Sequence, residues 1–236
     1  MSNYRCPLII MKKELMSYFT TPIAYIVITI FLLFTGFFFF KDFFYYNQAE
    51  MRSFFQLLPL FFCFVVPAAT MRLFSEERHS GTLEILMTLP VSTFDAVAGK
   101  IMAGTVFTAA MLAPTLIYII TVIVAGSPDP GPLIGGYFGS LLLGAACSSI
   151  GVLCSSFSKN QIIAFILSWA VCFILWLIDK IIIFVPVKLG FVEYLGSDFH
   201  FQNVAKGIID SRDIVYFASI IAVCLLFSMK FVEERK

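Results

Sequence analysis

Long apolar runs separated by short polar segments dominate the pattern of hydrophobic and polar positions along this chain. A helix needs about 20 apolar residues to cross the hydrocarbon core of a bilayer. Six runs approach or exceed that length, at residues 22–40, 54–71, 100–125, 133–157, 161–178 and 214–229. Pro67 and Pro114 lie inside two of these runs and should kink or interrupt the helices, because proline cannot donate a backbone hydrogen bond. The pattern therefore predicts an all-α polytopic membrane protein with six transmembrane helices.

Composition indicates that lipid is the solvent of this chain. Hydrophobic residues make up 60% of the 236 positions and charged residues 13%, and the mean hydropathy is +0.93. Ordinary soluble proteins have about 45–50% apolar and about 25% charged residues. The formal net charge of +1 leaves no basic face of the kind that nucleic-acid-binding proteins need, so we expect no nucleic-acid partner.

Six crossings place both termini on one side of the membrane, and the basic residues indicate which side. With the termini in the cytoplasm, ten of the 16 Lys and Arg residues fall in inner segments and six in outer segments. Because cytoplasmic loops carry an excess of Lys and Arg, this distribution predicts that both termini are cytoplasmic.

The segments outside the runs differ in length, and we expect one transmembrane domain over residues 1–236. Its parts are a lead-in (1–21), spans one and two (22–71), an inner loop (72–99), spans three to five (100–178), an outer segment (179–212), and the sixth span with its tail (213–236). One helical stripe of the lead-in is apolar and consists of Leu8, Met11, Leu15 and Phe19. Lys12, Lys13 and Ser17 face elsewhere, which is typical of an amphipathic helix at the membrane interface. A plain helical lead-in with no separate role explains this pattern equally well.

The inner loop holds the densest charge cluster of the chain, between Arg72 and Pro90. Gly81 and Thr82 suit a helix start, and Pro90 disfavours helical geometry before it, which predicts a short helix between them. Its apolar face consists of Leu83, Leu86 and Met87, and its polar face of Glu84 and Thr88. Such a helix either rests among lipid headgroups or docks into a groove of a cytoplasmic protein. The acidic polar face favours a protein, because membrane-resting helices usually present Lys and Arg.

Several short strings in this region follow one another at fixed spacing. Arg72 is followed by Phe-Ser-Glu-Glu-Arg at 74–78, Ser-Gly-Thr-Leu-Glu at 80–84, Leu-Pro-Val-Ser at 89–92 and Gly-Lys at 99–100. This series resembles the cytoplasmic loop of ABC-2-type export permeases, closest to the branch that includes gliding-motility permeases and the permease associated with nitrous oxide reductase maturation. The resemblance extends over the whole chain. His79 departs from it, since a Lys, Arg or other polar residue is expected there.

The resemblance implies a transmembrane permease subunit of an ATP-driven exporter in a bacterial inner membrane. The loop after the second span would be a coupling helix that docks on a separate ATP-binding subunit, and segment 179–212 would form re-entrant external helices that close the translocation path. Two permeases, identical or sisters, would pair with two ATP-binding subunits, with room for an accessory membrane or periplasmic protein. The residues implied in ATPase coupling are Arg72, Glu76, Glu77, Arg78, Gly81, Thr82, Leu83, Glu84, Leu86 and Met87. A rival hypothesis is a non-transporting membrane subunit that couples an ATPase to an envelope or motility machine.

The chain itself is not expected to be an enzyme or to bind a cofactor. Its Gly99-Lys100 pair lacks the glycine five residues earlier and the following Ser or Thr of a phosphate-binding loop, where Phe94 and Ile101 stand. ATP and Mg would therefore be bound by the partner subunit. His79 and His200 are too far apart in the predicted topology to share a metal.

Two further features of the spans each allow a structural and a functional interpretation. Small residues repeat every four positions in the fourth span, at Gly136, Ser140, Gly144 and Ser148. They either let helices of one subunit approach closely in lipid or form a wall of the path or of the subunit interface. Asp179 and Lys180 end the fifth span, where they either mark the outer boundary or form a relay or a substrate contact.

Overall fold

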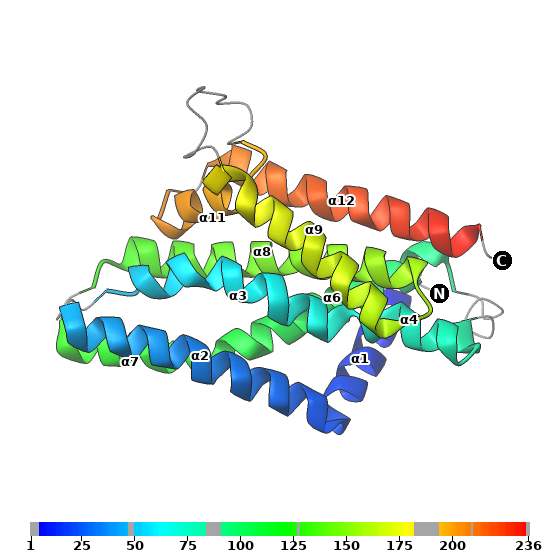
Figure 1. The fold of residues 1–236 in the computed structure, drawn as a ribbon, viewed down its shortest axis with the longest axis horizontal. Coiled ribbons are helices and arrows are strands. Elements are labelled where there is room, and N and C mark those ends of the chain that lie inside the picture. The colour runs from blue at the N-terminus through cyan, green and yellow to red at the C-terminus, as the bar shows by residue number, and fades with distance from the viewer. Residues whose placement is uncertain are drawn as a thin grey trace.

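The structure is a computed structural model that describes residues 5–46, 50–83, 91–126, 128–181, 194–208 and 210–234. Its long helices lie side by side in an elongated bundle (Figure 1). They are α2 (Pro22–Tyr46), α3 (Arg52–Thr70), α6 (Thr93–Leu112), α7 (Leu116–Ala125), α8 (Pro130–Phe157), α9 (Gln161–Ile181) and α12 (Ser211–Glu233). Among the described residues, six helices are long and apolar enough to cross a membrane, with α4 (Arg72–His79) counted as the continuation of α3 and α7 as that of α6. The predicted helical fold with six candidate spans is confirmed.

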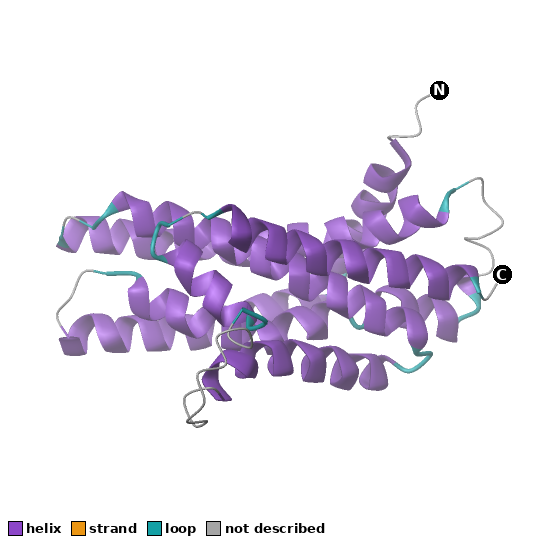
Figure 2. Ribbon diagram, turned by 90° about the horizontal axis from the view of Figure 1, so that it is seen from above, coloured by secondary structure: helices purple, strands orange, loops and turns teal. Residues whose placement is uncertain are grey.

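The other α-helices of the described part of the chain lie at the ends of the bundle, namely α1 (Arg5–Thr20), α4 and α11 (Ser197–Ala205). Both chain termini lie at one end, here called the terminal end, together with α4 (Figure 1). Helix α11 lies at the opposite end. Helix α1 is steeply inclined to the long helices, and Figure 2 shows it standing out from the bundle.

Pro114 divides the third span into two helices. A single 3₁₀ turn, Ala113–Thr115, separates α6 from α7. Because proline has no N–H and its ring crowds the preceding turn, the α-helical pattern stops before it and restarts beyond it. The predicted interruption therefore occurs at Pro114, whereas α3 remains helical through Pro67.

Helix α8 is the central element of the bundle. It packs against α3, α6, α9, α11 and α12, and 72% of its membrane-spanning stretch is buried, against 17% in α9 and in α12. Glycine and serine occupy many of its buried positions, which allows neighbouring backbones to approach in an environment where apolar burial gives little drive to associate. The peripheral helices instead expose large apolar side chains such as Phe37, Ile174 and Leu226.

At the terminal end, the start of α6 differs from the sequence-based expectation. Helix α6 begins at Thr93, where the Ser92 side chain caps it by accepting a hydrogen bond from the Asp95 N–H at 3.1 Å. This start lies seven residues before Lys100, where the apolar run begins. Helix α1 packs against α6 through the face that carries Ile10 and Tyr18, so Leu8 and Phe19 of the expected apolar stripe remain exposed.

Candidate functional site

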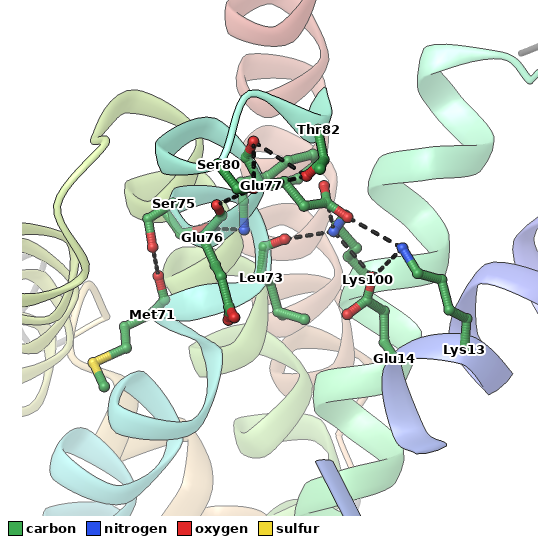
Figure 3. A network of polar contacts seen from close by, with 12 residues as sticks. Lys13, Glu14, Met71, Leu73, Ser75, Glu76, Glu77, Ser80, Thr82 and Lys100 are labelled. Atoms are coloured by element: carbon green, nitrogen blue, oxygen red, sulfur yellow. Dashed lines mark hydrogen bonds and ion pairs between the residues drawn. The ribbon is translucent and has the colours of Figure 1, made fainter. Parts of the chain in front are cut away.

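A buried lysine forms the centre of a charged cluster at the terminal end. Lys100 of α6 has a fully buried side chain, and its Nζ lies 3.1 Å from Glu14 Oε1 and 2.9 Å from Glu77 Oε2. The ammonium also donates to the Leu73 carbonyl oxygen and lies 4.6 Å from the centre of the Phe74 ring. Figure 3 shows Glu14 of α1 and Glu77 and Leu73 of α4 converging on Lys100 of α6.

A second lysine completes the cluster from the exposed side. Lys13 Nζ lies 3.4 Å from Glu77 Oε1 and 3.8 Å from Glu14 Oε1 (Figure 3). Its side chain is 63% exposed, whereas those of Glu14 and Glu77 are 12% and 15% exposed. Two cations therefore face two carboxylates, and we call these four residues the Lys100 network.

Glu77 has a different geometry toward each lysine. Its Oε1 accepts a hydrogen bond from Lys13, whereas Oε2 approaches Lys100 at an angle that gives an ion pair without a hydrogen bond. Removing one partner of a buried ion pair typically costs about 3–5 kcal/mol, because the remaining charge is left without compensation. The Lys100 network therefore holds α1, α4 and α6 together as one unit.

Helix α4 is anchored to the rest of the bundle on other sides as well. The Phe74 backbone N–H donates to Ser155 Oγ at 2.9 Å, and the Arg78 guanidinium donates to the Ser156 carbonyl oxygen, both on α8. Arg72 donates to Thr21 Oγ1 at 3.4 Å and stacks over the Tyr18 ring at 4.5 Å. The two arginines thus tie α4 to its neighbours.

Tyr18 links α1 to the end of α3. Its hydroxyl donates to the Ala69 carbonyl oxygen at 2.9 Å, and its ring stacks on Phe107 with centroids 4.9 Å apart. Burial raises the pKa of the Tyr18 phenol, although the Arg72 charge acts in the opposite direction. The phenol therefore remains protonated at neutral pH and keeps its donor role.

The segment that follows α4 begins with a glycine turn. Gly81 has φ +73°, a left-handed conformation in which a side chain would be strained, and it ends α4. Thr82 and Leu83 then already have helical geometry. Leu83 packs in part against the chain's own core cluster, so it is less available to a partner than the sequence suggested. Glu76 of α4 and Thr82 are exposed. The predicted residues Glu84, Leu86 and Met87 lie outside the described residues.

A second polar cluster lies at the opposite end, around α11. Lys180 binds both Asp179, at 3.1 Å, and Asp198 of α11. Lys180 therefore pairs with its neighbour on α9 and with a residue of a different helix, so these residues also connect α9 to α11. Nearby, His200 Nδ1 lies 2.6 Å from Asp213 Oδ1, which joins α11 to α12. Groups of three or more His, Cys, Asp or Glu side chains suited to a metal do not occur within the described ranges.

The small residues of α8 face other helices of the same chain. A Cβ atom built on Gly136 would lie 2.3 Å from the Phe55 ring of α3, and one on Gly144 would lie 2.5 Å from Thr108 Cγ2 of α6. Ser148 approaches Gly104 of α6, and both Ser140 and Ser148 are fully buried. Gly136, Gly144 and Ser148 therefore serve close contacts of α8 with α3 and α6.

Sequence reasoning did not identify Lys13, Glu14 and Lys100 as members of a site. The apolar pattern predicts that a span begins at Lys100, although this lysine lies about two turns into α6. Two sequence features could have indicated this site: a lysine followed by a long apolar helix, and a glutamate on the lead-in. Ionisable residues in such surroundings usually have a specific partner.

The comparisons with known proteins agree with the membrane fold and with the inner-loop resemblance. A family model described as ABC-2 family transporter protein matches residues 41–197, about two thirds of the chain. A search of curated proteins returned no significant match. The matched range includes α4, the Lys100 end of α6 and the central helix α8. With six candidate spans and this match, the chain belongs to the ABC-2 family of transporter proteins, as a multi-pass membrane permease subunit of an ABC transporter.

Proposed function

We propose that this chain is the translocation subunit of an ATP-driven exporter. Conformational changes of a separate ATP-binding subunit would be transmitted to it at its terminal end. The observation that carries this proposal is the anchoring of α4. Its Glu77 and the Leu73 carbonyl bind Lys100, while Phe74 and Arg78 bind α8. A displacement of the loop that follows α4 would therefore move α1, α6 and the central helix α8 together with α4.

The partner surface would consist of the exposed side of α4 and the residues that follow it. Glu76, His79 and Ser80 are exposed there, and the apolar residues Leu86 and Met87 come shortly afterwards in the sequence. An apolar helix face that enters a groove, flanked by polar residues, is a common mode of helix recognition. The terminal end would then be cytoplasmic, in a bacterial inner membrane, with ATP and Mg bound by the partner.

The opposite end would control exit from the path. Helix α11 is held to α9 by Lys180 and Asp198 and to α12 by His200 and Asp213. Polar contacts of this kind at the end of the spans suit short helices that close a path on the outer side. Two permeases, as copies or sisters, would enclose the path between them, each with one ATP-binding subunit.

A substitution at Leu86 tests the coupling role. Leu86→Asp would put a carboxylate into the apolar contact, which costs at least about 1–3 kcal/mol. This corresponds to an approximately ten- to hundredfold weaker docking. We expect normal membrane levels, reduced co-purification of the ATP-binding subunit and loss of transport-coupled hydrolysis.

The matched control is Glu76→Gln, which neutralises an exposed charge on the same surface and should change docking little. If Leu86→Asp keeps both the bound ATP-binding subunit and coupled hydrolysis, the loop after α4 is not the coupling element. If the subunit binds but no solute ever stimulates hydrolysis in the wild-type complex, a non-transporting assembly role would replace the export function.

A further inference from the structure

The outward face of α1 combines exposed apolar side chains with two lysines. Ile9 is 64% exposed, Met16 60% and Leu8 51%, and Lys12 and Lys13 are exposed beside them. At 100° per residue, Ile9 and Met16 lie between the two lysines on the helix surface. Because α6 covers the other face of α1, the exposed apolar side chains Leu8, Ile9 and Met16 are not needed for packing within the bundle.

This face is continuous with the apolar surface of the first span. The Phe19 ring of α1 meets the Tyr25 ring of α2 edge to face, with centroids 6.3 Å apart, and both rings are exposed. Ile23 and Ile26 extend the exposed apolar surface along α2. Since α2 is a membrane span, the adjoining face of α1 lies where the hydrocarbon meets the headgroups. Lipid is therefore a better occupant of this face than a soluble protein.

We propose that Lys12 and Lys13 bind the phosphate of an anionic phospholipid, whose acyl chains lie against Ile9 and Met16. Lysine stems extend along apolar surface while the ammonium group reaches the phosphate layer, which suits this arrangement. Charge complementarity selects an anionic headgroup, because two neighbouring cations face it. Lys12 has no ion pair in the described part of the chain that would compete for the headgroup.

Lys13 connects this lipid site to the Lys100 network. Its ion pairs with Glu77 and Glu14 are long and its side chain is mostly exposed, so a phosphate can draw it away at small cost. Glu77 would keep its 2.9 Å contact with Lys100. Lipid charge would thus change the strength of the contact between α1 and α4. This consequence for coupling rests on the proposed function, whereas lipid binding itself does not rest on it.

Native mass spectrometry of the purified chain tests lipid binding without any ATP-binding subunit. The chain is offered phosphatidylglycerol and phosphatidylcholine with identical acyl chains at equal concentrations. We expect retained phosphatidylglycerol to exceed phosphatidylcholine in the wild type, and the Lys12→Gln/Lys13→Gln variant to lose about tenfold in this preference. Lys159→Gln/Lys230→Gln removes two exposed lysines from the same end and should keep the preference.

Three outcomes would overturn the lipid site. One is an equal loss of preference in both double variants, which would make the effect one of net charge. Another is displacement of phosphatidylglycerol by the same concentration of inorganic phosphate, which would indicate a free-anion site. The third is unchanged lipid retention in Lys12→Gln/Lys13→Gln with weaker binding of the ATP-binding subunit, which would make this face a protein contact. Helical circular dichroism equal to the wild type confirms that each variant is folded.

Discussion

At Lys100 the side-chain ammonium has exchanged water for two carboxylates, a carbonyl oxygen and an aromatic ring. An isolated charge in an apolar interior would be very costly, and only paired and hydrogen-bonded groups offset that cost. The two partner carboxylates come from α1 and α4, so the compensation of one buried charge depends on the positions of three helices. The positions of α1, α4 and α6 at the terminal end therefore depend on one another through Lys100.

The first residue-scale prediction compares the two lysines of the network. Lys100→Met keeps the length of the side chain but leaves Glu14 and Glu77 without their buried partner. We expect the free energy of unfolding in detergent to fall by about 3–5 kcal/mol. Lys13→Met should cost at most about 1 kcal/mol, because that lysine is mostly exposed. Denaturant titration followed by circular dichroism measures both.

A compensating variant separates charge from packing at this position. Adding Glu14→Gln and Glu77→Gln to Lys100→Met removes the unpaired carboxylates and should recover a large part of the lost stability. Equal losses for Lys100→Met and Lys13→Met would show that the burial of Lys100 does not determine the strength of the network.

At the scale of elements, α8 depends on glycines where other helices cross it closely. A methyl group at Gly144 would lie 2.5 Å from Thr108 Cγ2, and the tightly packed neighbour on α6 would have to move. By contrast, Gly131 near the start of α8 has only the Asp129 carboxylate within reach, at 3.5 Å. The same substitution should therefore have different effects at the two ends of one helix.

We predict that Gly144→Ala lowers the free energy of unfolding by about 1–3 kcal/mol, the usual cost of overpacking. Gly131→Ala should be close to neutral. Combining Gly144→Ala with Thr108→Ala removes the clashing methyl and should be less destabilising than the sum of the two single changes. Thermal unfolding of the purified variants in detergent measures the comparison. Strict additivity would mean that α6 and α8 do not meet at these two residues.

The elements differ in how far sequence predicts them. Length and apolar composition are local properties, so they identified the six spans and the interruption at Pro114. The apolar pattern does not predict the start of α6, because a lysine before a long apolar run indicates the boundary of a membrane span when its ion-pair partners are unknown. Those partners are remote: Glu14 lies 86 positions before Lys100, and Lys13 lies 64 positions before Glu77. No periodicity links such residues, and only the packing of α1 against α6 brings them together.

At the scale of the whole molecule, the two ends of the bundle differ in what they hold. The terminal end carries the Lys100 network, α4 and the start of the family-matched inner loop, while the opposite end carries α11 with its Lys180–Asp198 and His200–Asp213 pairs. In the sequence, ten of the 16 Lys and Arg residues fall in the predicted inner segments. Because positive charge is retained on the cytoplasmic side during insertion, this asymmetry predicts that the terminal end is cytoplasmic.

Cysteine labelling in intact cells tests that orientation. Ser80 after α4 and Ser211 at the start of α12 are both exposed and lie at opposite ends. Five of the six native cysteines are buried, so a Cys6→Ser background removes the more accessible thiol. We expect Ser211→Cys to react with a membrane-impermeant maleimide from outside, and Ser80→Cys to react only after permeabilisation. The reverse result would place the inner loop outside the cell, where no ATP-binding subunit could reach it, and would exclude the proposed coupling at this end.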